Sequence, residues 1–411
     1  MTVRPSLPAV GTPWPALETR MRALATADVD WRAGRTAVYV FNAGEDIEAV
    51  QKAAYAAFMA ENGLGPAAFP SLKQMEAEVI GYGLSLLHAP DGADGAMTSG
   101  GTDSITMALK AARDFARKEK GRAGPLNIVL PRSAHLAFDK AAALMEIEVR
   151  RTPLKDFLAD PQAMDAAADA DTVMIVGSAP CFPYGLIDPI AALGTLAEVR
   201  GLWLHVDACV GGYASPFVRM NGVPIAPFDF EVPGVSSLSA DLHKYGFCAK
   251  GASTVLFRSE ALKAHMTFDF RDWPGGRMVT PTLAGTRPGG AVAAAWAVMN
   301  YLGVEGYRAR HRQVTDARVI IEAGVRSRGF EVVGAPQLGL VAFHGMASPA
   351  ALWTRMRERG WFTSTISDPP GLHLMLSPVH LGVAGTYLDD LDWALSSGPE
   401  PSASSAPRYA G

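Results

Sequence analysis

Two lysines six residues apart are the side chains in this sequence best suited to nucleophilic chemistry. They lie in the segment SADLHKYGFCAKG (239–251), where Lys244 follows His243 and Lys250 closes a run of small and aromatic residues. A lysine in an apolar pocket has a lowered pKa, and its neutral amine attacks aldehydes. The alternative is a solvated loop lysine, the usual state of a single lysine. Whether a lysine here is reactive or merely solvated depends on which other polar residues lie near it.

Three other groups follow predicted strands. Asp207 ends LWLHVDA (202–208), and a carboxylate at the mouth of a buried strand needs a cationic or donor partner. His135 follows NIVL (127–130), although taken alone it is more often an ordinary histidine at a helix start. The segment SGGTDS (99–104) opens a predicted helix, whose free N–H groups and dipole favour an anion. Alone, a Gly-Gly pair before a helix is more often only a turn.

A metal centre is the first alternative for this set. His205 and Asp207 stand two apart in a strand and therefore share a face. A third ligand is not evident in the sequence, so we expect no metal.

The combination favours one cofactor instead. An anion cradle, a histidine able to stack on a ring, a buried carboxylate and a lysine all fall at predicted strand ends, where one ligand could meet them. Pyridoxal 5′-phosphate (PLP) needs an anion site, a carboxylate for its ring nitrogen and a lysine for its aldehyde. We therefore expect PLP.

The elements that position these residues follow an α/β pattern. Short apolar strands at 127–130, 172–177, 202–208, 235–240 and 253–258 alternate with helices at 105–120, 134–144 and 191–200. This alternation predicts a mostly parallel sheet of the seven-stranded type, covered on both faces. Ligands of such sheets bind at the carboxyl ends of the strands.

The 411 residues are too many for one small core, and we divide them into four parts. An N-terminal segment, with a helix at 45–60, leads into a large PLP-binding domain. An apolar helix at 289–302 leads out of it into a small α/β domain, predicted from a helix at 307–328 and the short strands FEVVG, GLVAFH and LHLMLS. The Ser/Pro-rich tail predicts disorder. The predicted boundaries are 1–55, 56–300, 301–396 and 397–411.

Composition excludes several classes of protein. The formal net charge of −4 gives no basic excess for nucleic acid or an anionic membrane. There is no uninterrupted apolar run of the roughly 18 residues that a membrane span needs. The cysteines at 181, 209 and 248 are too few and too scattered for a disulfide framework, which favours a reducing compartment and the cytoplasm.

Four segments resemble those of one known family. SGGTDSITMALKAARD, HVDACVGGYASPF, SADLHKYGFCAKG and PTLAGTRPGG are similar in order and spacing to segments of the sphingosine-1-phosphate lyases. FPSLKQMEAEV (69–79) adds to the likeness, which runs from about Val38 to Leu376. These lyases are PLP enzymes of fold type I related to the group II amino-acid decarboxylases. The resemblance implies the PLP-dependent transferase fold.

The resemblance also implies roles at the cofactor. Lys244 would bind the cofactor aldehyde, Asp207 would pair with the ring nitrogen, and His135 would stack on the ring. The cofactor phosphate would be held by the helix start and an adjacent imidazole, which are Gly101, Thr102 and His243.

Other matched residues concern the substrate and a second subunit. Gly285 and Thr286 resemble the loop through which a neighbouring subunit completes the phosphate site, which implies a homodimer with shared active sites. Their plain alternative is a Gly/Pro turn. Tyr39 matches a tyrosine that faces the substrate, and its alternative is an aromatic packed in a strand. Lys250 matches a second lysine that contacts the substrate.

The sequence departs from the family at one motif. The family has Asn-Pro-Leu-His before its FPS segment, and that histidine helps to bind the substrate phosphate. Here the residues are Asn62, Gly63, Leu64 and Gly65. The membrane-anchoring N-terminal helix of eukaryotic relatives has no counterpart, which fits a soluble bacterial-type enzyme.

The implied reaction is retro-aldol cleavage of a phosphorylated long-chain base, a lipid-like amine, with Tyr39 and Lys250 as candidates for proton transfer. A group II amino-acid decarboxylase would share Lys244, Asp207 and His135. A noncatalytic binding or scaffolding protein with the PLP fold would not need all of the residues that bind the cofactor, and their presence argues against this alternative. A nucleotide-binding Rossmann protein would need a Gly-rich fingerprint that the sequence lacks.

Overall fold

A seven-stranded sheet forms the centre of the molecule in the computed structural model, which describes residues 4–396. Its strand order is β1-β9-β8-β7-β6-β2-β3, and only β9 runs antiparallel to its neighbours. The mostly parallel seven-stranded prediction is confirmed. The strands in sheet order are β1 (Asp94–Thr98), β9 (Ser253–Phe257), β8 (Val235–Ala240), β7 (Trp203–Asp207), β6 (Thr172–Ser178), β2 (Asn127–Pro131) and β3 (Glu148–Thr152).

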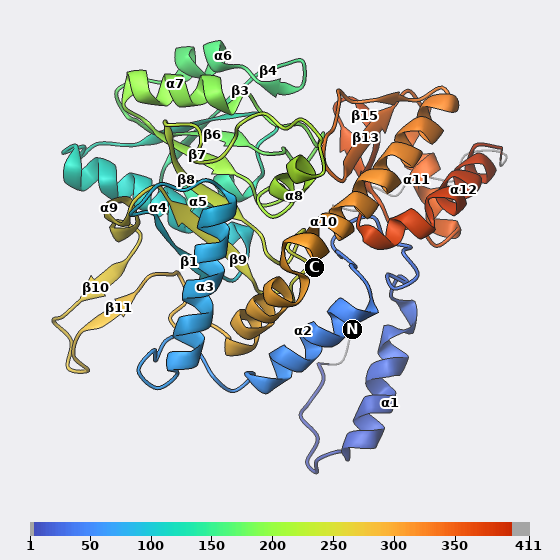
Figure 1. Ribbon diagram of the computed structural model, residues 1–411, viewed down its shortest axis with the longest axis horizontal. Coiled ribbons are helices and arrows are strands. Elements are labelled where there is room, and N and C mark those ends of the chain that lie inside the picture. Colours follow the sequence, from blue (N-terminus) through green and yellow to red (C-terminus); the bar gives the residue numbers. More distant parts are fainter. Residues whose placement is uncertain (1–3, 397–411) are drawn as a thin grey trace.

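Helices cover both faces of this sheet because its central strands are apolar on both sides. Ile128 and Leu130 pack with α4 and α5 on one face, whereas Val129 between them belongs to the core shared with α3 and α7 on the other. Figure 1 shows this layered arrangement. The helices of this part are α3 (Pro70–Leu86), α4 (Gly101–Glu119), α5 (Ala137–Leu144), α6 (Pro161–Ala167), α7 (Ile190–Arg200), α8 (Ser215–Met220) and α9 (Glu260–Ala264); a short hairpin joins β4 (Leu154–Lys155) and β5 (Leu158–Ala159).

A long helix, α10 (Gly289–Ser327), links the sheet to the C-terminal part of the chain. The two helices predicted here are joined at Gly303, whose φ of 54° is non-helical and bends the axis. Beyond it lies an antiparallel sheet in the order β12-β13-β15-β14. Its elements are β12 (Glu331–Val332), β13 (Leu340–His344), α11 (Pro349–Glu358), β14 (Ser364–Ser367), β15 (Pro370–Met375), the 3₁₀ turn η2 (Pro378–Gly382) and α12 (Ala384–Ser396). The four-part division of the chain stays a prediction, and the predicted disordered tail lies outside the described residues.

One helix of the N-terminal segment lies along α10. Helix α2 (Glu45–Ala57) packs on α10, so the helix predicted at 45–60 finds its partner within the chain. Before it come α1 (Trp14–Leu24) and the turn η1 (Ala25–Ala27). The strand alternative for Tyr39 is wrong, because this residue has a left-handed φ of 65° and a 41% exposed side chain.

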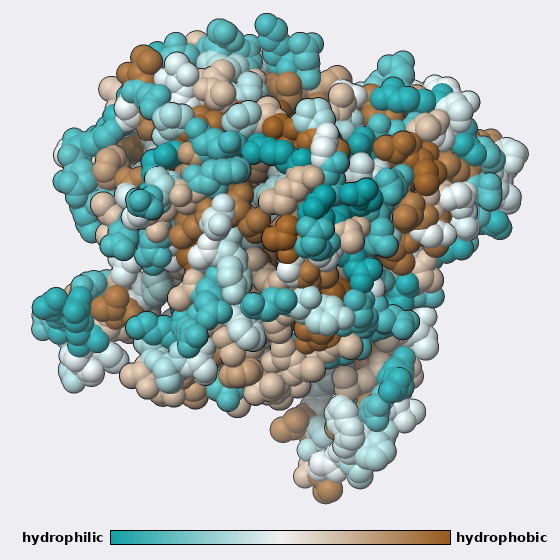
Figure 2. Space-filling model, viewed as in Figure 1, coloured by the Kyte–Doolittle hydropathy of each residue, from teal (hydrophilic) through white to brown (hydrophobic). Residues whose placement is uncertain are grey.

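Two segments project from the body of the molecule (Figure 1). One is α1, which has no buried residue, and the other is the hairpin of β10 (Phe268–Phe270) and β11 (Met278–Thr280). Both carry exposed apolar side chains among polar ones (Figure 2), including Trp14, Phe268 and Trp273. Among the described residues, no helix has the length and apolar character needed to cross a membrane.

Candidate active site

A cavity of about 390 Å³ lies at the carboxyl ends of the sheet strands. It brings together six of the predicted site residues, namely Gly101, Thr102, His135, Asp207, His243 and Lys244. Four others, Tyr39, Lys250, Gly285 and Thr286, are not among its lining residues. Asp241 and Cys209, to which the sequence analysis gave no role, also line it.

Lys244 forms a buried ion pair with Asp241. Its Nζ lies 2.9 Å from Asp241 Oδ2, and the carboxylate is only 2% exposed. Burial by itself lowers the pKa of Lys244, but the charge and hydrogen bond of Asp241, together with the nearby Cys209 and Asp207, outweigh burial and raise the pKa above its ordinary value. The prediction of a lowered pKa is therefore wrong for this form of the protein, because it overlooked the carboxylate three residues before the lysine.

The start of α4 forms the opposite wall of the cavity. A Cβ on Gly101 would lie 2.7 Å from Cys209 Sγ and 3.0 Å from Asp241 Oδ2, so only glycine lets the helix start approach so closely. The Asp103 side chain accepts hydrogen bonds from the backbone N–H and the hydroxyl of Ser99, which holds the preceding turn. The first N–H groups of α4 have no intrahelical partner and suit an anion.

Asp207 presents one carboxylate oxygen to the cavity. Its Oδ1 accepts hydrogen bonds from the Cys209 N–H at 3.1 Å and from the Ser239 hydroxyl at 3.3 Å. No hydrogen bond from another described residue reaches Oδ2. The side chain is thus fixed by one oxygen while the other stays available for a ring nitrogen.

Two imidazoles complete the cavity, and both are held neutral at pH 7. Burial lowers the pKa of His135, and its Nδ1 accepts the Ala137 N–H at 3.1 Å. Burial likewise lowers the pKa of His243, whose Nδ1 accepts the Ala252 N–H at 3.3 Å. In each ring Nε2 therefore carries the proton. A Cβ on Gly100 would touch the His243 ring at 3.4 Å, so this imidazole lies against the helix start.

Lys250 and Tyr39 lie together beside the cavity. The Lys250 ammonium donates to the carbonyls of Tyr39 at 2.8 Å and His243 at 3.2 Å. Its Nζ is also 5.3 Å from the centroid of the Phe41 ring. Burial of the ammonium and the charge of Lys244 lower the pKa of Lys250 to about 8, although part of its side chain is exposed. Of the two lysines, it is therefore Lys250, and not Lys244, whose pKa is lowered.

Gly285 lines another cavity, of about 190 Å³, together with Asn62, Gly63 and Leu64 of the loop in which the family has its histidine. Thr286 is the next residue and is exposed. A Cβ on Gly285 would be 3.7 Å from Leu64, the residue before Gly65. Arg287 anchors this loop through an ion pair with Glu76 and a hydrogen bond to the Met97 carbonyl. Within one chain these residues do not meet Lys244.

The His205–Asp207 pair is explained without a metal. Both His205 nitrogens are hydrogen-bonded to serines, Nδ1 to Ser237 at 2.8 Å and Nε2 to Ser239 at 3.2 Å. Elsewhere a group of metal-ligand type is formed by His88, Asp229 and Glu231, where Glu231 already pairs with an arginine. None of these three residues lines the cavity that contains Lys244.

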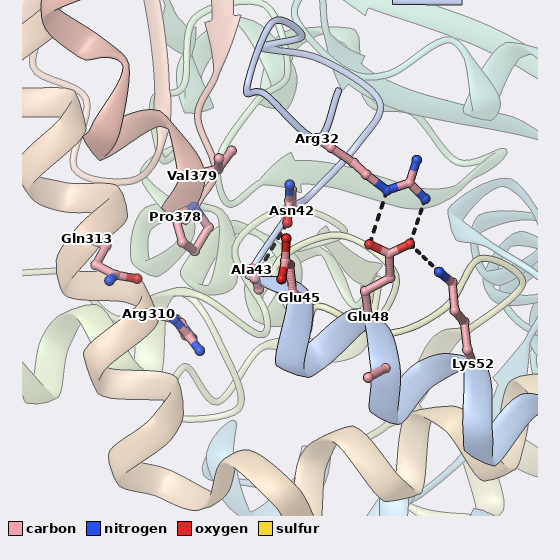
Figure 3. Close-up of a pocket in the computed structure, with 12 residues that line it drawn as sticks. Arg32, Asn42, Ala43, Glu45, Glu48, Lys52, Arg310, Gln313, Pro378 and Val379 are labelled. Carbon is pink, nitrogen blue, oxygen red and sulfur yellow. Dashed lines mark hydrogen bonds and ion pairs between the residues drawn. The ribbon is translucent and has the colours of Figure 1, made fainter. Parts of the chain in front are cut away.

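A larger cavity, of about 600 Å³, lies between α2, α10 and the start of η2 (Figure 3). Two of its cations are paired with one carboxylate: Arg32 and Lys52 both contact Glu48, each at 2.7 Å. It contains none of the predicted site residues. Size alone therefore does not identify the site, and we assign the chemistry to the cavity that contains Lys244.

That cavity fits PLP on its own geometry. The glycine at the start of α4 leaves room where a Cβ would collide, and the helix start supplies donors for a phosphate. Asp207 is available for the ring nitrogen, and Asp241 Oδ1 is buried without a hydrogen-bond partner among the described residues. Lys244 faces the same space from the end of β8.

Comparison with known proteins supports this assignment. Residues 5–345 match the pyridoxal-dependent decarboxylase conserved domain. A sphingosine-1-phosphate lyase of Oryza sativa subsp. japonica is 40% identical over 95% of this chain and 74% of its own length. The structure of the sphingosine-1-phosphate lyase of Burkholderia pseudomallei has a TM-score of 0.91 at 36% identity and covers 96% of this chain and 93% of that one.

A relative with another activity is also similar. A probable L-tyrosine/L-aspartate decarboxylase of Methanocella arvoryzae is 37% identical over 76% of this chain and 81% of its own. The lyases, however, match more of this chain. The chain therefore belongs to the pyridoxal-dependent decarboxylase family and, within it, to the sphingosine-1-phosphate lyases, enzymes whose cofactor is PLP.

Proposed function

We propose that this enzyme cleaves the C2–C3 bond of a phosphorylated long-chain base such as sphingosine-1-phosphate, giving a fatty aldehyde and phosphoethanolamine. The observation that carries the proposal is the second lysine, whose ammonium lies in the loop of Lys244 and is anchored by two backbone carbonyls. A cation fixed beside the cofactor cavity suits a substrate that carries both an amine and a phosphate.

The side chains have separate tasks in this proposal. Bound PLP supplies an electron sink for the electron pair left at C2. Asp207 would face the ring nitrogen and stabilise its proton, and His135 would cover the ring. Asp241 would hold the Lys244 nitrogen whenever that lysine is not bound to the cofactor. A base, Tyr39 or Lys250, takes the proton of the 3-hydroxyl as C2–C3 breaks, and C2 then receives a proton.

The decarboxylase alternative is kept because of the Methanocella relative. One experiment separates the two activities. Purified enzyme is given sphingosine-1-phosphate and, separately, a panel of amino acids, and both aldehyde and CO₂ are measured. The proposal expects aldehyde and phosphoethanolamine in equal amounts and no CO₂. Release of CO₂ from an amino acid, with no aldehyde from the phosphorylated base, would replace the lyase by the decarboxylase.

Replacing Lys250 by alanine should reduce cleavage of the phosphorylated base by about a hundredfold or more, because a charge-assisted contact is lost. Since the pKa of Lys250 is about 8, its charge is present below that pH and is lost above it. With Lys250 as the cation for the substrate phosphate and Tyr39 as the base, the wild-type kcat/KM should therefore fall above about pH 8, and Lys250→Ala should lack that step. A rise of kcat/KM through that pH would instead identify Lys250 as the base.

The control for this variant is Lys52→Ala, which removes a lysine that is paired in the other cavity. It should retain wild-type turnover, and both variants should retain the absorbance of the bound cofactor. If Lys250→Ala cleaves the phosphorylated base normally, Lys250 is only a structural contact of the Tyr39 loop.

We further propose a homodimer with shared active sites, located in the cytoplasm. In support, Thr286 is exposed and lies outside the Lys244 cavity, and α1 and the β10–β11 hairpin carry exposed apolar side chains. The three cysteines are free and buried, as suits a reducing compartment.

Mixing two inactive variants should restore activity if the sites are shared. Lys244→Ala removes the cofactor lysine, and Thr286→Glu places a negative charge where the partner's cofactor phosphate would lie. In a heterodimer one site receives an intact Lys244 from one chain and an intact Thr286 from the other. An equal mixture, unfolded and refolded together, should recover about a quarter of wild-type activity by random pairing. No recovery from chains that do form heterodimers would argue against shared sites.

A further inference from the structure

A line of buried polar side chains runs from the interior of the sheet to Asp207. Trp203, His205 and Asp207 alternate along β7, so their side chains leave the same face. On β8, Ser237 is paired in register with His205, and Ser239 with Asp207. His205, Ser237 and Ser239 are each 0% exposed. None of the sequence motifs gave these serines a role.

The hydrogen bonds in this line can run in only one direction. The Trp203 indole can only donate, and it donates to Ser237 Oγ at 2.8 Å. At the other end Ser239 donates its one proton to Asp207 Oδ1, so it has none left for His205, and His205 Nδ1 must accept the Ser237 hydroxyl at 2.8 Å. This leaves the proton of the neutral imidazole on Nε2, which donates to Ser239 Oγ at 3.2 Å.

The last hydroxyl then points at the carboxylate. Ser239 Oγ also accepts the Cys209 thiol at 3.3 Å, so its own proton is directed to Asp207 Oδ1 at 3.3 Å. Burial lowers the pKa of His205 to about 4, which keeps the imidazole neutral and preserves this order at neutral pH. The opposite tautomer would turn the Ser239 proton away from Asp207.

We propose that Ser237, His205 and Ser239 act as a relay of positioning residues that directs a hydrogen bond to Asp207 Oδ1 and so keeps Oδ2 aimed at the PLP ring nitrogen. The relay rests on the proposed pairing of Asp207 with that nitrogen. Aligned hydrogen bonds in a buried site polarise one another. Removing one relay residue should therefore weaken the hydrogen bond that Asp207 accepts, even if that residue does not touch the cofactor. None of the three relay residues lines the cavity.

The test compares two ligands of the apoenzyme. One is PLP, and the other is an analogue in which C–H replaces the ring nitrogen, so that it cannot pair with Asp207. Ser239→Ala should weaken PLP binding by about tenfold, the loss expected for one hydrogen bond to a buried charge. His205→Phe, which keeps a ring against Phe138, should do the same although it never touches the cofactor. Affinity for the analogue should stay within about twofold.

A spectroscopic readout and a control complete the design. In wild type the nitrogen-15 signal of labelled PLP should be that of a protonated ring nitrogen, and in both variants it should move toward the unprotonated position. Ser236→Ala on the same strand should change neither readout, because its side chain takes no part in the hydrogen bonds of the relay. If His205→Phe does not fold, Ser237→Ala takes its place.

The outcomes distinguish the relay from the role of Asp207. Asp207→Asn should abolish the preference for PLP over the analogue; if the preference survives, Asp207 is not the partner of the ring nitrogen. If Asp207→Asn loses the preference while Ser239→Ala and His205→Phe keep it, the relay is wrong and Asp207 acts alone.

Discussion

Replacing Lys244 by alanine should reduce lyase turnover by roughly 10⁴-fold or more, as the loss of a covalent catalytic residue does. The same change leaves the Asp241 carboxylate buried and unpaired. Removing one partner of a buried ion pair costs about 3 kcal/mol, so the free energy of unfolding of the apoenzyme should fall by about that amount. Turnover and urea unfolding measure the two effects.

Lys244→Arg separates these effects. Arginine keeps a cation beside Asp241 but cannot bind the cofactor aldehyde. This variant should retain most of the stability that Lys244→Ala loses, and it should be just as inactive. An active Lys244→Arg enzyme would show that the covalent lysine is elsewhere.

Asp207→Asn should lower kcat by on the order of a hundredfold or more while the fold is kept. The amide retains the shape of the carboxylate but cannot stabilise a proton on the ring nitrogen, so the electron sink weakens at the moment when charge develops at C2. Both the Cys209 N–H and the Ser239 hydroxyl can still donate to the asparagine oxygen. The thermal unfolding temperature should therefore change little.

Steady-state kinetics with the phosphorylated base measure this loss. A matched variant is Asp139→Asn, which changes a carboxylate on α5 that pairs with an arginine away from the cavity. It should keep wild-type kcat. Near-normal turnover of Asp207→Asn would mean that Asp207 is structural and that another group holds the ring.

The sheet was predictable because its strands are short and apolar on both faces. The runs at 172–177, 203–207 and 235–240 have no other stable place than between two layers of helices, and the structure has strands at each. The small C-terminal sheet was harder to predict. Strand β14 and helices α11 and α12 were missed, since their four to thirteen residues carry mixed polarity and acquire order only by packing on one another.

The cofactor side of the site was predictable because strand order brings its parts together. Gly101, His135, Asp207 and Lys244 all follow strands, and all line one cavity. The charge state of Lys244 was not predicted. It depends on how close a loop carboxylate comes in space, and spacing along the chain does not fix that distance. The left-handed backbone of Tyr39 was missed for a similar reason, since a contact with Lys250 from far along the chain holds it.

The most direct test of the account is to locate the covalent attachment of PLP. The holoenzyme is reduced with borohydride and digested, and the pyridoxyl group is mapped by mass spectrometry. Because Lys244 and Lys250 lie six residues apart in one segment, fragmentation between them must assign the site. The account predicts the label on Lys244 alone. A label on Lys250, or no labelled peptide from this segment, would contradict it.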